Sequence, residues 1–193
     1  MLNTSRSRSR QALLFAQNFI KHPKMIGSFI PSSKYLIDRL LGKVDWQRAC
    51  VIVEYGPGVG TISREVLQRM RGDAVLIVIE MNEDFVGFLR QSMRDPRLRI
   101  VHGSAVDVRQ ALASQGLEAA DYIISGIPYT TLPEHLREQV MRETREALAP
   151  GGAFLVYQFT RAVLPYLQDT FDVVTEEFEP LNILPAQLFH CPR

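Results

Sequence analysis

Residues 51–60 have the sequence VIVEYGPGVG, in which a short apolar run leads directly into three alternate glycines. The run predicts a buried strand over Cys50–Glu54, and the residues after the glycines predict a helix over Thr61–Met70. Glycine tolerates positive φ and lets other groups approach the backbone closely. The stretch is therefore expected to form a strand, a tight turn and a helix, which is either a plain connection or the binding loop of a doubly wound α/β fold.

The remaining sequence continues this alternation of strands and helices. The segment AVLIVIE at Ala74–Glu80 is the clearest strand. Pro150-Gly151-Gly152 is a strong signal that the helix before it ends. The alternation predicts an α/β fold with a mostly parallel, seven-stranded sheet, helices on both faces and an antiparallel pair at one edge. Further strands are expected at Leu98–His102, Ala120–Ser125 and Ala153–Phe159 and near Phe171–Val174 and Ile183–Phe189, and further helices at Glu83–Met93 and Glu134–Leu148.

The chain divides into an N-terminal helical segment, residues 1–48, and a domain, residues 49–193. The segment predicts a helix over Arg10–Lys21 and, after a proline-containing loop, a second helix over Ser32–Leu41. It holds nine Lys and Arg against two acids, a net charge of +7, whereas the domain holds 13 basic and 19 acidic residues, a net charge of −6. A basic arm on an acidic body favours a polyanionic partner, either nucleic acid or an anionic membrane surface.

The first expected helix is amphipathic. Its apolar stripe includes Leu13, Phe15 and Phe19, and basic residues flank it. Such a stripe either packs on the domain's own core or lies in a membrane interface, and the positive charge favours contact with anionic membrane lipids.

Composition places the chain among globular proteins, with 46% hydrophobic and 22% charged residues. No run of 18 apolar residues and no secretory signal are present. Cys50 and Cys191 lack metal-ligand spacing and are expected to be reduced core residues. We therefore expect a cytoplasmic, peripherally membrane-associated protein that needs no metal.

Two acids accompany the glycine loop. Glu54 stands two residues before Gly56, and Glu80 ends the next strand 20 residues after Gly60. At the place of Glu80 in a doubly wound sheet, a carboxylate can accept hydrogen bonds from both ribose hydroxyls. The strand, the G-x-G-x-G spacing and the two acids in register resemble motif I and its partner acid in the S-adenosylmethionine (SAM)-dependent methyltransferases, whose fold is the Rossmann-like class I type.

This resemblance implies SAM as the methyl donor, with S-adenosylhomocysteine as the product. It implies that Glu54 and the glycine backbone hold the methionine end, that Glu80 holds the ribose and that Met81 lies beside the adenine. Ser104 stands where the family commonly has the Asp that binds the adenine amino group. The cofactor-binding residues of the domain implied in this way are Glu54, Gly56, Pro57, Gly58, Gly60, Glu80, Met81, Ser104, Ala105 and Ser125.

The fourth expected strand is followed by Ser125-Gly126-Ile127-Pro128-Tyr129. In relatives that methylate the amino group of adenine, this place is Asn-Leu-Pro-Tyr or Asn-Pro-Pro-Tyr, and the Asn side chain and a backbone carbonyl accept hydrogen bonds from the amine. Gly126 removes the side-chain acceptor, whereas the carbonyls and the Pro-Tyr pair remain. The loop therefore indicates either an amine site that is not built to recognise a base edge or a rigid loop that only closes a strand.

The front segment, KHPKMIGSFIPSS at residues 21–33, adds a second resemblance. Together with the glycine loop and the Ser-Gly-x-Pro loop, it is similar to the bacterial phospholipid N-methyltransferases over about residues 16–160. That family converts phosphatidylethanolamine stepwise to phosphatidylcholine, and the resemblance places Ser28 and Phe29 in a segment that closes over bound SAM. The first two motifs are shared with the rRNA adenine dimethyltransferases. An RNA or DNA adenine N-methyltransferase and a catalytically silent SAM-binding or lipid-binding module are the alternatives.

No His or acid stands out as an obligatory base, so catalysis is expected to come mainly from positioning. The candidate catalytic residues are Gly126 and Pro128, through the carbonyls of their loop, Tyr129, through its hydroxyl, and Tyr35. The rings of Tyr35, Tyr129 and Tyr157 are also candidates for holding a methylated ammonium by cation–π attraction.

Overall fold

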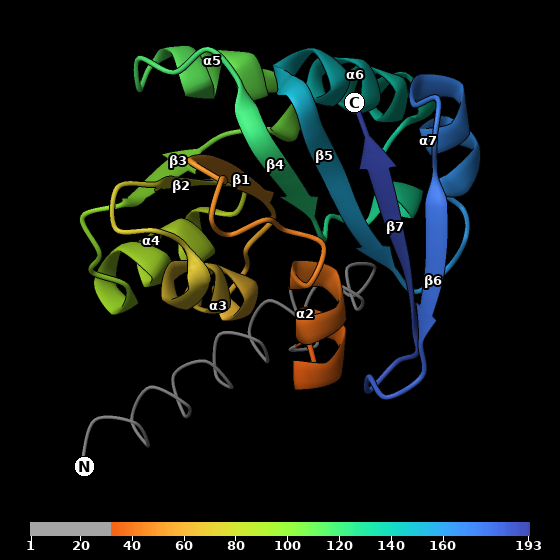
Figure 1. Ribbon diagram of the computed structural model, residues 1–193, viewed down its shortest axis with the longest axis horizontal. Coiled ribbons are helices and arrows are strands. Elements are labelled where there is room, and N and C mark those ends of the chain that lie inside the picture. The colour runs from red at the N-terminus through yellow and green to blue at the C-terminus, as the bar shows by residue number, and fades with distance from the viewer. Residues whose placement is uncertain (1–31) are drawn as a thin grey trace.

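Seven strands form a single sheet in the order β3-β2-β1-β4-β5-β7-β6 in the computed structural model, which describes residues 32–193 (Figure 1). Strands β1 to β5 are parallel, and β7 runs antiparallel between β5 and β6. The predicted α/β fold with an antiparallel pair at one edge is therefore confirmed. The expected helix Arg10–Lys21 and the loop that holds Ser28 and Phe29 lie outside the described residues.

The bounds of the elements agree with most of the sequence-based ranges to within one or two residues. The strands are β1 Val51–Tyr55, β2 Val75–Glu80, β3 Leu98–His102, β4 Ala120–Ser125, β5 Leu148–Gln158, β6 Thr175–Glu179 and β7 Ala186–Pro192. The helices are α2 Lys34–Leu41, α3 Thr61–Arg69, α4 Glu83–Ser92, α5 Val108–Ala113, α6 Glu134–Ala147 and α7 Leu164–Thr170. Two short 3-10 turns, Ala105–Asp107 and Tyr129–Thr131, follow β3 and β4.

Both faces of the sheet are buried, because successive side chains of a strand point to opposite faces. One face packs against α5, α6 and α7 and includes Val53 and Phe154. The other packs against α2, α3 and α4 and includes Ile52 and Leu155 (Figure 1). This double burial explains why the strands are nearly continuous apolar runs in the sequence.

Helix α2 belongs to the second of these faces. Its side chains Leu36, Ile37, Leu40 and Leu41 are buried, and the hydroxyl of Ser33 caps its start by accepting the Leu36 N–H at 3.2 Å. Ion pairs from Arg39 of α2 to Glu179 and from Lys43, just after α2, to Glu177 join this part of the chain to β6. The C-terminal part of the predicted front segment is therefore part of the core around the sheet.

Helix α6 ends before Pro150-Gly151-Gly152 as expected, but the predicted start of the fifth strand at Ala153 is wrong, because β5 already begins at Leu148. Pairing with β4 moves from Ala120↔Leu148 to Tyr122↔Ala153, so three extra residues of β5 form a bulge. Gly151 has φ +79°, and a Cβ on Gly152 would lie 2.7 Å from the Asp121 carbonyl oxygen. The glycines therefore permit a bulge within a strand rather than a loop between elements.

The two cysteines differ in their surroundings. Cys191 is buried in β7 as expected, whereas Cys50 precedes β1 and is exposed, so the prediction that both lie in the core is wrong for Cys50. Across residues 32–193, the helices are too short and too polar for any of them to cross a membrane.

Candidate functional site

A pocket of about 390 Å³ lies at the carboxyl ends of the first four strands, where the strand order reverses between β1 and β4. This is where open α/β sheets bind ligands. Its volume is in the range of small-molecule sites. The pocket is lined by Gly56, Ile79, Glu80, Met81, Asn82, Gly103, Ser104, Ala105, Val106, Gly126, Ile127, Pro128, Thr131, Leu132, Leu136 and Val140.

The glycine loop after β1 forms one wall of the pocket. Gly56 has φ +66°, and a Cβ added to it would lie 2.7 Å from Ile127 Cγ2 on the opposite loop. Gly60, with φ +76°, is the N-cap residue of α3, and its N–H donates to the Pro57 carbonyl at 2.8 Å. Glycine is therefore required in this loop for two reasons, the positive φ of its backbone and the close packing around it.

Glu80 ends β2 and lines the pocket with only 8% of its surface exposed. Its Oε2 accepts the Gly58 N–H at 3.1 Å, and its Oε1 accepts the Asn82 N–H at 2.9 Å. Burial raises the pKa of this carboxyl, and the backbone N–H groups counteract that effect. The Met81 N–H is a third backbone group that lowers this pKa. A carboxylate has about four lone-pair positions, so some acceptor capacity remains for a hydroxyl group in the pocket.

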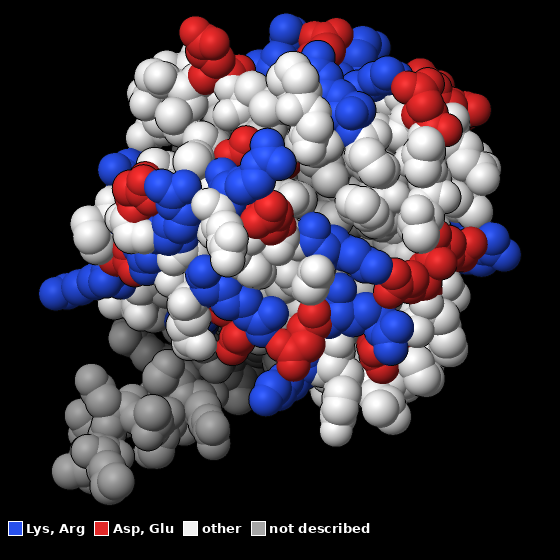
Figure 2. Space-filling view, viewed as in Figure 1, with Lys and Arg blue, Asp and Glu red and all other residues white. Residues whose placement is uncertain are grey.

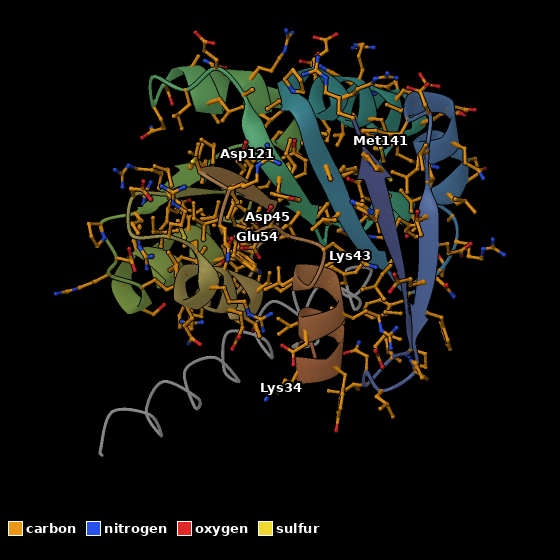
Figure 3. The ribbon with its side chains drawn as sticks, in the orientation of Figure 1. Lys34, Lys43, Asp45, Glu54, Asp121 and Met141 are labelled. Atoms are coloured by element: carbon orange, nitrogen blue, oxygen red, sulfur yellow. The ribbon has the colours of Figure 1, made fainter. Side chains whose placement is uncertain are left out.

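Glu54 lies on β1 near the middle of the molecule (Figure 3). It is 3% exposed, and its Oε2 accepts a hydrogen bond from Ser63 Oγ at 2.5 Å. Burial raises the pKa of Glu54 to about 7, the Ser63 hydroxyl lowers it, and the charge of Glu80 raises it further. Glu54 is not among the residues that line the pocket, although it stands next to the loop that does.

This raised pKa predicts that the free energy of unfolding depends on pH. Between the ordinary carboxyl pKa and about 7, the folded chain holds a proton on Glu54 that the unfolded chain releases, so stability falls as pH rises through this window. The loss amounts to about 3 kcal/mol once both states are ionised. We expect Glu54→Gln to remove most of this difference in the free energy of unfolding. Urea unfolding at pH 5 and pH 8 without ligand measures it.

The exposed Glu83 in the first turn of α4 provides a matched control for this experiment. Glu83→Gln should retain the full pH dependence of the wild-type protein. Equal pH dependence in wild type and in Glu54→Gln would contradict the assignment of the shift to Glu54.

The residues expected beside an adenine also line the pocket. Met81 follows β2 and is 68% exposed, and its carbonyl contacts His102 Nε2 at 3.1 Å. Ser104 Oγ accepts the Val106 N–H at 3.4 Å at the start of the turn that contains Ala105. A largely apolar wall from Ile79, Val106 and Leu136 completes this side of the pocket.

The segment at the end of β4, residues 125–129, is the expected site of the methyl acceptor and is called the acceptor loop. Only part of it lines the pocket. Gly126 and Pro128 line it, but Tyr129 is 1% exposed and lies in the core on the α6 face of the sheet. The hydroxyls of Tyr129 and Ser125 are 3.0 Å apart. The 3-10 turn that begins at Tyr129 directs its ring inward, so these two residues contact each other rather than the space in front of Gly126.

Tyr157 occupies the space that a side chain at position 126 would fill. A Cβ on Gly126 would overlap the Tyr157 hydroxyl and lie 2.5 Å from its Cζ. Burial raises the pKa of Tyr157 to about 12, while a hydrogen bond with Ser32 lowers it and the charge of Glu54 raises it. The phenol therefore stays neutral at physiological pH and stands beside the acceptor loop as both donor and acceptor.

The carbonyls of the acceptor loop already have partners inside the fold. The Ile127 carbonyl accepts from Gln158 Nε2 at 2.8 Å, and the Pro128 carbonyl accepts from the Thr131 N–H at 3.0 Å. The Gly126 N–H likewise donates to the Tyr55 carbonyl at 3.3 Å. These bonds fix the shape of the loop, and the Tyr157 hydroxyl stands next to Gly126, although Tyr157 is not among the residues that line the pocket.

Some site residues were not found from the sequence. Asn82 lines the pocket and caps α4, and an Asn directly before an acidic helix start is a recognisable capping signal. Tyr157 was predicted only as an aromatic ring for an ammonium group, and its contact with Gly126 in the loop after β4 has no local signal. Tyr35, by contrast, was predicted but is 60% exposed on α2 and does not line the pocket. Within residues 32–193, His, Cys, Asp and Glu side chains form no group of three that could hold a metal ion.

Comparisons with known proteins agree with this geometry. A family model described as a methyltransferase domain matches residues 52–152. The chain is 33% identical over 180 residues to the ornithine lipid N-methyltransferase of Singulisphaera acidiphila, spanning 92% of this chain and 94% of that protein. It is 30% identical over 119 residues to ribosomal RNA small subunit methyltransferase A of Mycoplasma mycoides, spanning 61% of this chain and 43% of that protein.

A solved structure shares the fold. The precorrin-6y C5,15-methyltransferase of Geobacter metallireducens aligns with a TM-score of 0.64 and 15% identity, over 82% of this chain and 88% of that one. At this level of identity, the alignment supports the arrangement of the sheet and its helices and does not point to a particular substrate.

Proposed function

Because this chain belongs to the family of SAM-dependent methyltransferases that includes the ornithine lipid N-methyltransferase, we propose that it methylates the primary amine of a membrane lipid head group. The head group we propose is phosphatidylethanolamine, methylated stepwise toward phosphatidylcholine. The similarity to the ornithine lipid enzyme over nearly the whole chain carries the lipid part of the proposal and makes ornithine lipid the second candidate acceptor.

The pocket fits the adenosine part of SAM. The acceptor capacity of Glu80 suits the two ribose hydroxyls, and the apolar wall next to Met81, Ser104 and Ala105 suits a flat base. The methionine end would then extend along the glycine loop, next to which Glu54 stands. When bound, SAM supplies a methyl group carried on a positively charged sulfur.

The chain's own contribution is to present an amine with a free lone pair. A primary ammonium has a pKa near that of lysine, so losing its proton at pH 7 costs about 4–5 kcal/mol. The neutral Tyr157 hydroxyl and the Gly126 backbone can take hydrogen bonds from the amine and fix its direction. Positioning of this kind can supply most of the rate acceleration of a displacement reaction.

An adenine N-methyltransferase is the alternative, favoured by the similarity to ribosomal RNA small subunit methyltransferase A. Gly126 counts against it, because the position has no side-chain carbonyl to accept from a base amino group. Binding assays with RNA and with liposomes over a salt series separate the two. Strong, salt-dependent RNA binding together with no liposome binding would favour the alternative.

The direct test is mass spectrometry of lipids from a bacterial host that lacks phosphatidylcholine, with and without this chain expressed. We expect mono-, di- and trimethylated phosphatidylethanolamine to appear only with the chain. Methylated ornithine lipid alone would move the proposal to the second acceptor. No transfer of radiolabelled methyl to any lipid would contradict the proposal and leave a silent SAM-binding or lipid-binding module.

We further propose that residues 1–31 attract the enzyme to anionic membranes at the cytoplasmic side. A chain that starts near Met25 retains α2 and the whole sheet, so it should fold. It should lose binding to liposomes that contain phosphatidylglycerol, because each Lys or Arg near an anionic surface contributes about 1 kcal/mol. Co-sedimentation at rising salt checks this, since salt screens the attraction. Unchanged sedimentation of the shortened chain would show that the segment is not the anchor.

A further inference from the structure

An exposed apolar loop lies beside the N-terminus of α2. The β6–β7 loop, residues 180–185, has the sequence PLNILP and carries no charge. Leu181 is 61% exposed, Ile183 is 70% exposed and Leu184 is 39% exposed. Tyr35, 60% exposed, extends from the first turn of α2. Large apolar side chains gathered in this way on a surface mark an interaction site.

The loop is held in one shape although its apolar side chains face outward. Asn182 is 8% exposed, its Oδ1 accepts the Ser33 N–H at 2.8 Å, and its Nδ2 donates to the Leu184 carbonyl at 2.8 Å. The Leu181 N–H donates to Glu179 Oε1 at 2.8 Å. The loop is therefore fastened to the start of α2, and the exposed side chains project from a fixed base.

The position of the loop relates it to the pocket. Ala186 of β7 pairs with Glu179 of β6, and Gln187 pairs with Gln158 at the carboxyl end of β5, so the loop extends beyond the same edge of the sheet as the pocket. Figure 1 shows the loop and the start of α2 together at this edge, to which β4 and β5 point. In Figure 2, uncharged side chains project from the same lower edge of the molecule.

The charges around the loop suit a lipid surface. Glu177 and Glu179, the acids nearest to it in the sequence, are paired with Lys43, just after α2, and with Arg39 of α2. Lys34, exposed at the start of α2, lies at the lower edge in Figure 3. A surface with neutralised acids, an exposed Lys and an apolar tip can approach phospholipid head groups without repulsion.

We infer that the β6–β7 loop inserts Leu181 and Ile183 into the boundary between head groups and acyl chains of a membrane, with Tyr35 at its side. This inference rests on the proposed lipid substrate, and it adds a contact that is separate from the basic residues 1–31. Insertion at this edge turns the carboxyl ends of the strands, and so the pocket, toward the head groups. The contact is apolar, so it should persist in neutral membranes and at high salt.

The full-length chain with Ile183→Trp tests the insertion directly. On vesicles of neutral phosphatidylcholine, its fluorescence should shift to shorter wavelength as the indole leaves water, after subtraction of the signal from the single native Trp. Val173→Trp is the matched control, because Val173 is 56% exposed and precedes the opposite end of β6. The fluorescence of the Val173→Trp variant should not shift when vesicles are added.

The chain with both Leu181→Ser and Ile183→Ser measures the strength of the contact. Its partition onto neutral vesicles should fall at least tenfold, because burying one Leu or Ile side chain changes a partition coefficient by about ten- to a hundredfold. Val173→Ser should bind like wild type. Methyl transfer to lipid in detergent micelles should remain, so a failure of the proposed lipid activity in wild type is distinguishable from a failure of the vesicle contact.

Three results would overturn the inference. One is an unshifted fluorescence spectrum of the Ile183→Trp variant on vesicles to which the protein binds. Another is a signal at short wavelength already in solution and unchanged by vesicles, which would show that residues 1–31 cover the loop. The third is a shift that depends on protein concentration without lipid and accompanies a dimer in sedimentation velocity, which would make a second copy the partner.

Discussion

Glu80→Ala should lower the affinity for SAM at least a hundredfold while the protein remains folded. In the proposed cofactor site the carboxylate accepts hydrogen bonds from the ribose hydroxyls, and a hydrogen bond to a charged group contributes about 1.5–3 kcal/mol. The substitution also removes the acceptor of the Gly58 N–H and so loosens the glycine loop. Stability should change little, because burying this carboxyl is itself unfavourable, as its raised pKa indicates, and water in the pocket can replace its bonds.

Titration calorimetry with SAM and thermal unfolding measure the two effects separately. Glu83→Ala is the matched control, since Glu83 is an exposed acid three residues later in the first turn of α4. Gly58→Ala should also abolish SAM binding, because Gly58 has φ +55° and its N–H must reach Glu80. Wild-type affinity in a folded Glu80→Ala protein would remove Glu80 from the cofactor site.

Tyr157→Phe should lower kcat for methyl transfer about tenfold to a hundredfold and leave SAM affinity within about threefold, as expected for a group that orients the amine rather than binds the donor. Gly126→Ala should do more. Its methyl group must displace the Tyr157 ring, which costs about 1–3 kcal/mol of stability as overpacking does elsewhere. The two variants therefore share a loss of kcat, but only Gly126→Ala should lower the unfolding temperature strongly.

Tyr166→Phe is the control for a lost tyrosine hydroxyl. Tyr166 lies on α7, and its hydroxyl accepts a hydrogen bond from Arg137 Nη1 at 2.8 Å, away from the acceptor loop. This variant should lose some stability and keep the wild-type kcat. Full kcat in Tyr157→Phe would show that the phenol only fills space.

The succession of strands could be predicted from the sequence because the strands are buried on both faces and end at clear signals, whereas the short helices α5 and α7 were not predicted. β3 and β4 occur at the predicted residues, and the helices after β1 and β2 begin at the predicted residues. The start of β5 could not be predicted. The bulge of β5 requires glycine at position 152, because a side chain there would meet the Asp121 carbonyl of the neighbouring strand. The sequence around Gly152 does not show which strand pairs with this segment, so it cannot predict the bulge.

The two halves of the candidate site differ in the same way. The glycine loop and Glu80 were predictable because strand ends and their spacing bring them together in any sheet of this order. The environment of Tyr129 was not, because one short turn decides whether its ring points into the core or the pocket. The partnership of Gly126 and Tyr157 depends on the register of β4 and β5, where Ser125 pairs with Val156.

The place of β7 governs when the chain can fold during synthesis. β7 lies between β5 and β6, although it is the last of the seven strands to leave the ribosome. Until residues 186–192 are made, β6 has no neighbour in the sheet, and Leu188 is missing from the core under α2. The apolar face of α2, residues 34–41, is therefore made long before Leu188, one of the side chains that share its core. Such long-range pairing slows folding and leaves nascent chains open to aggregation. We therefore expect chaperones to bind the incomplete chain on the ribosome.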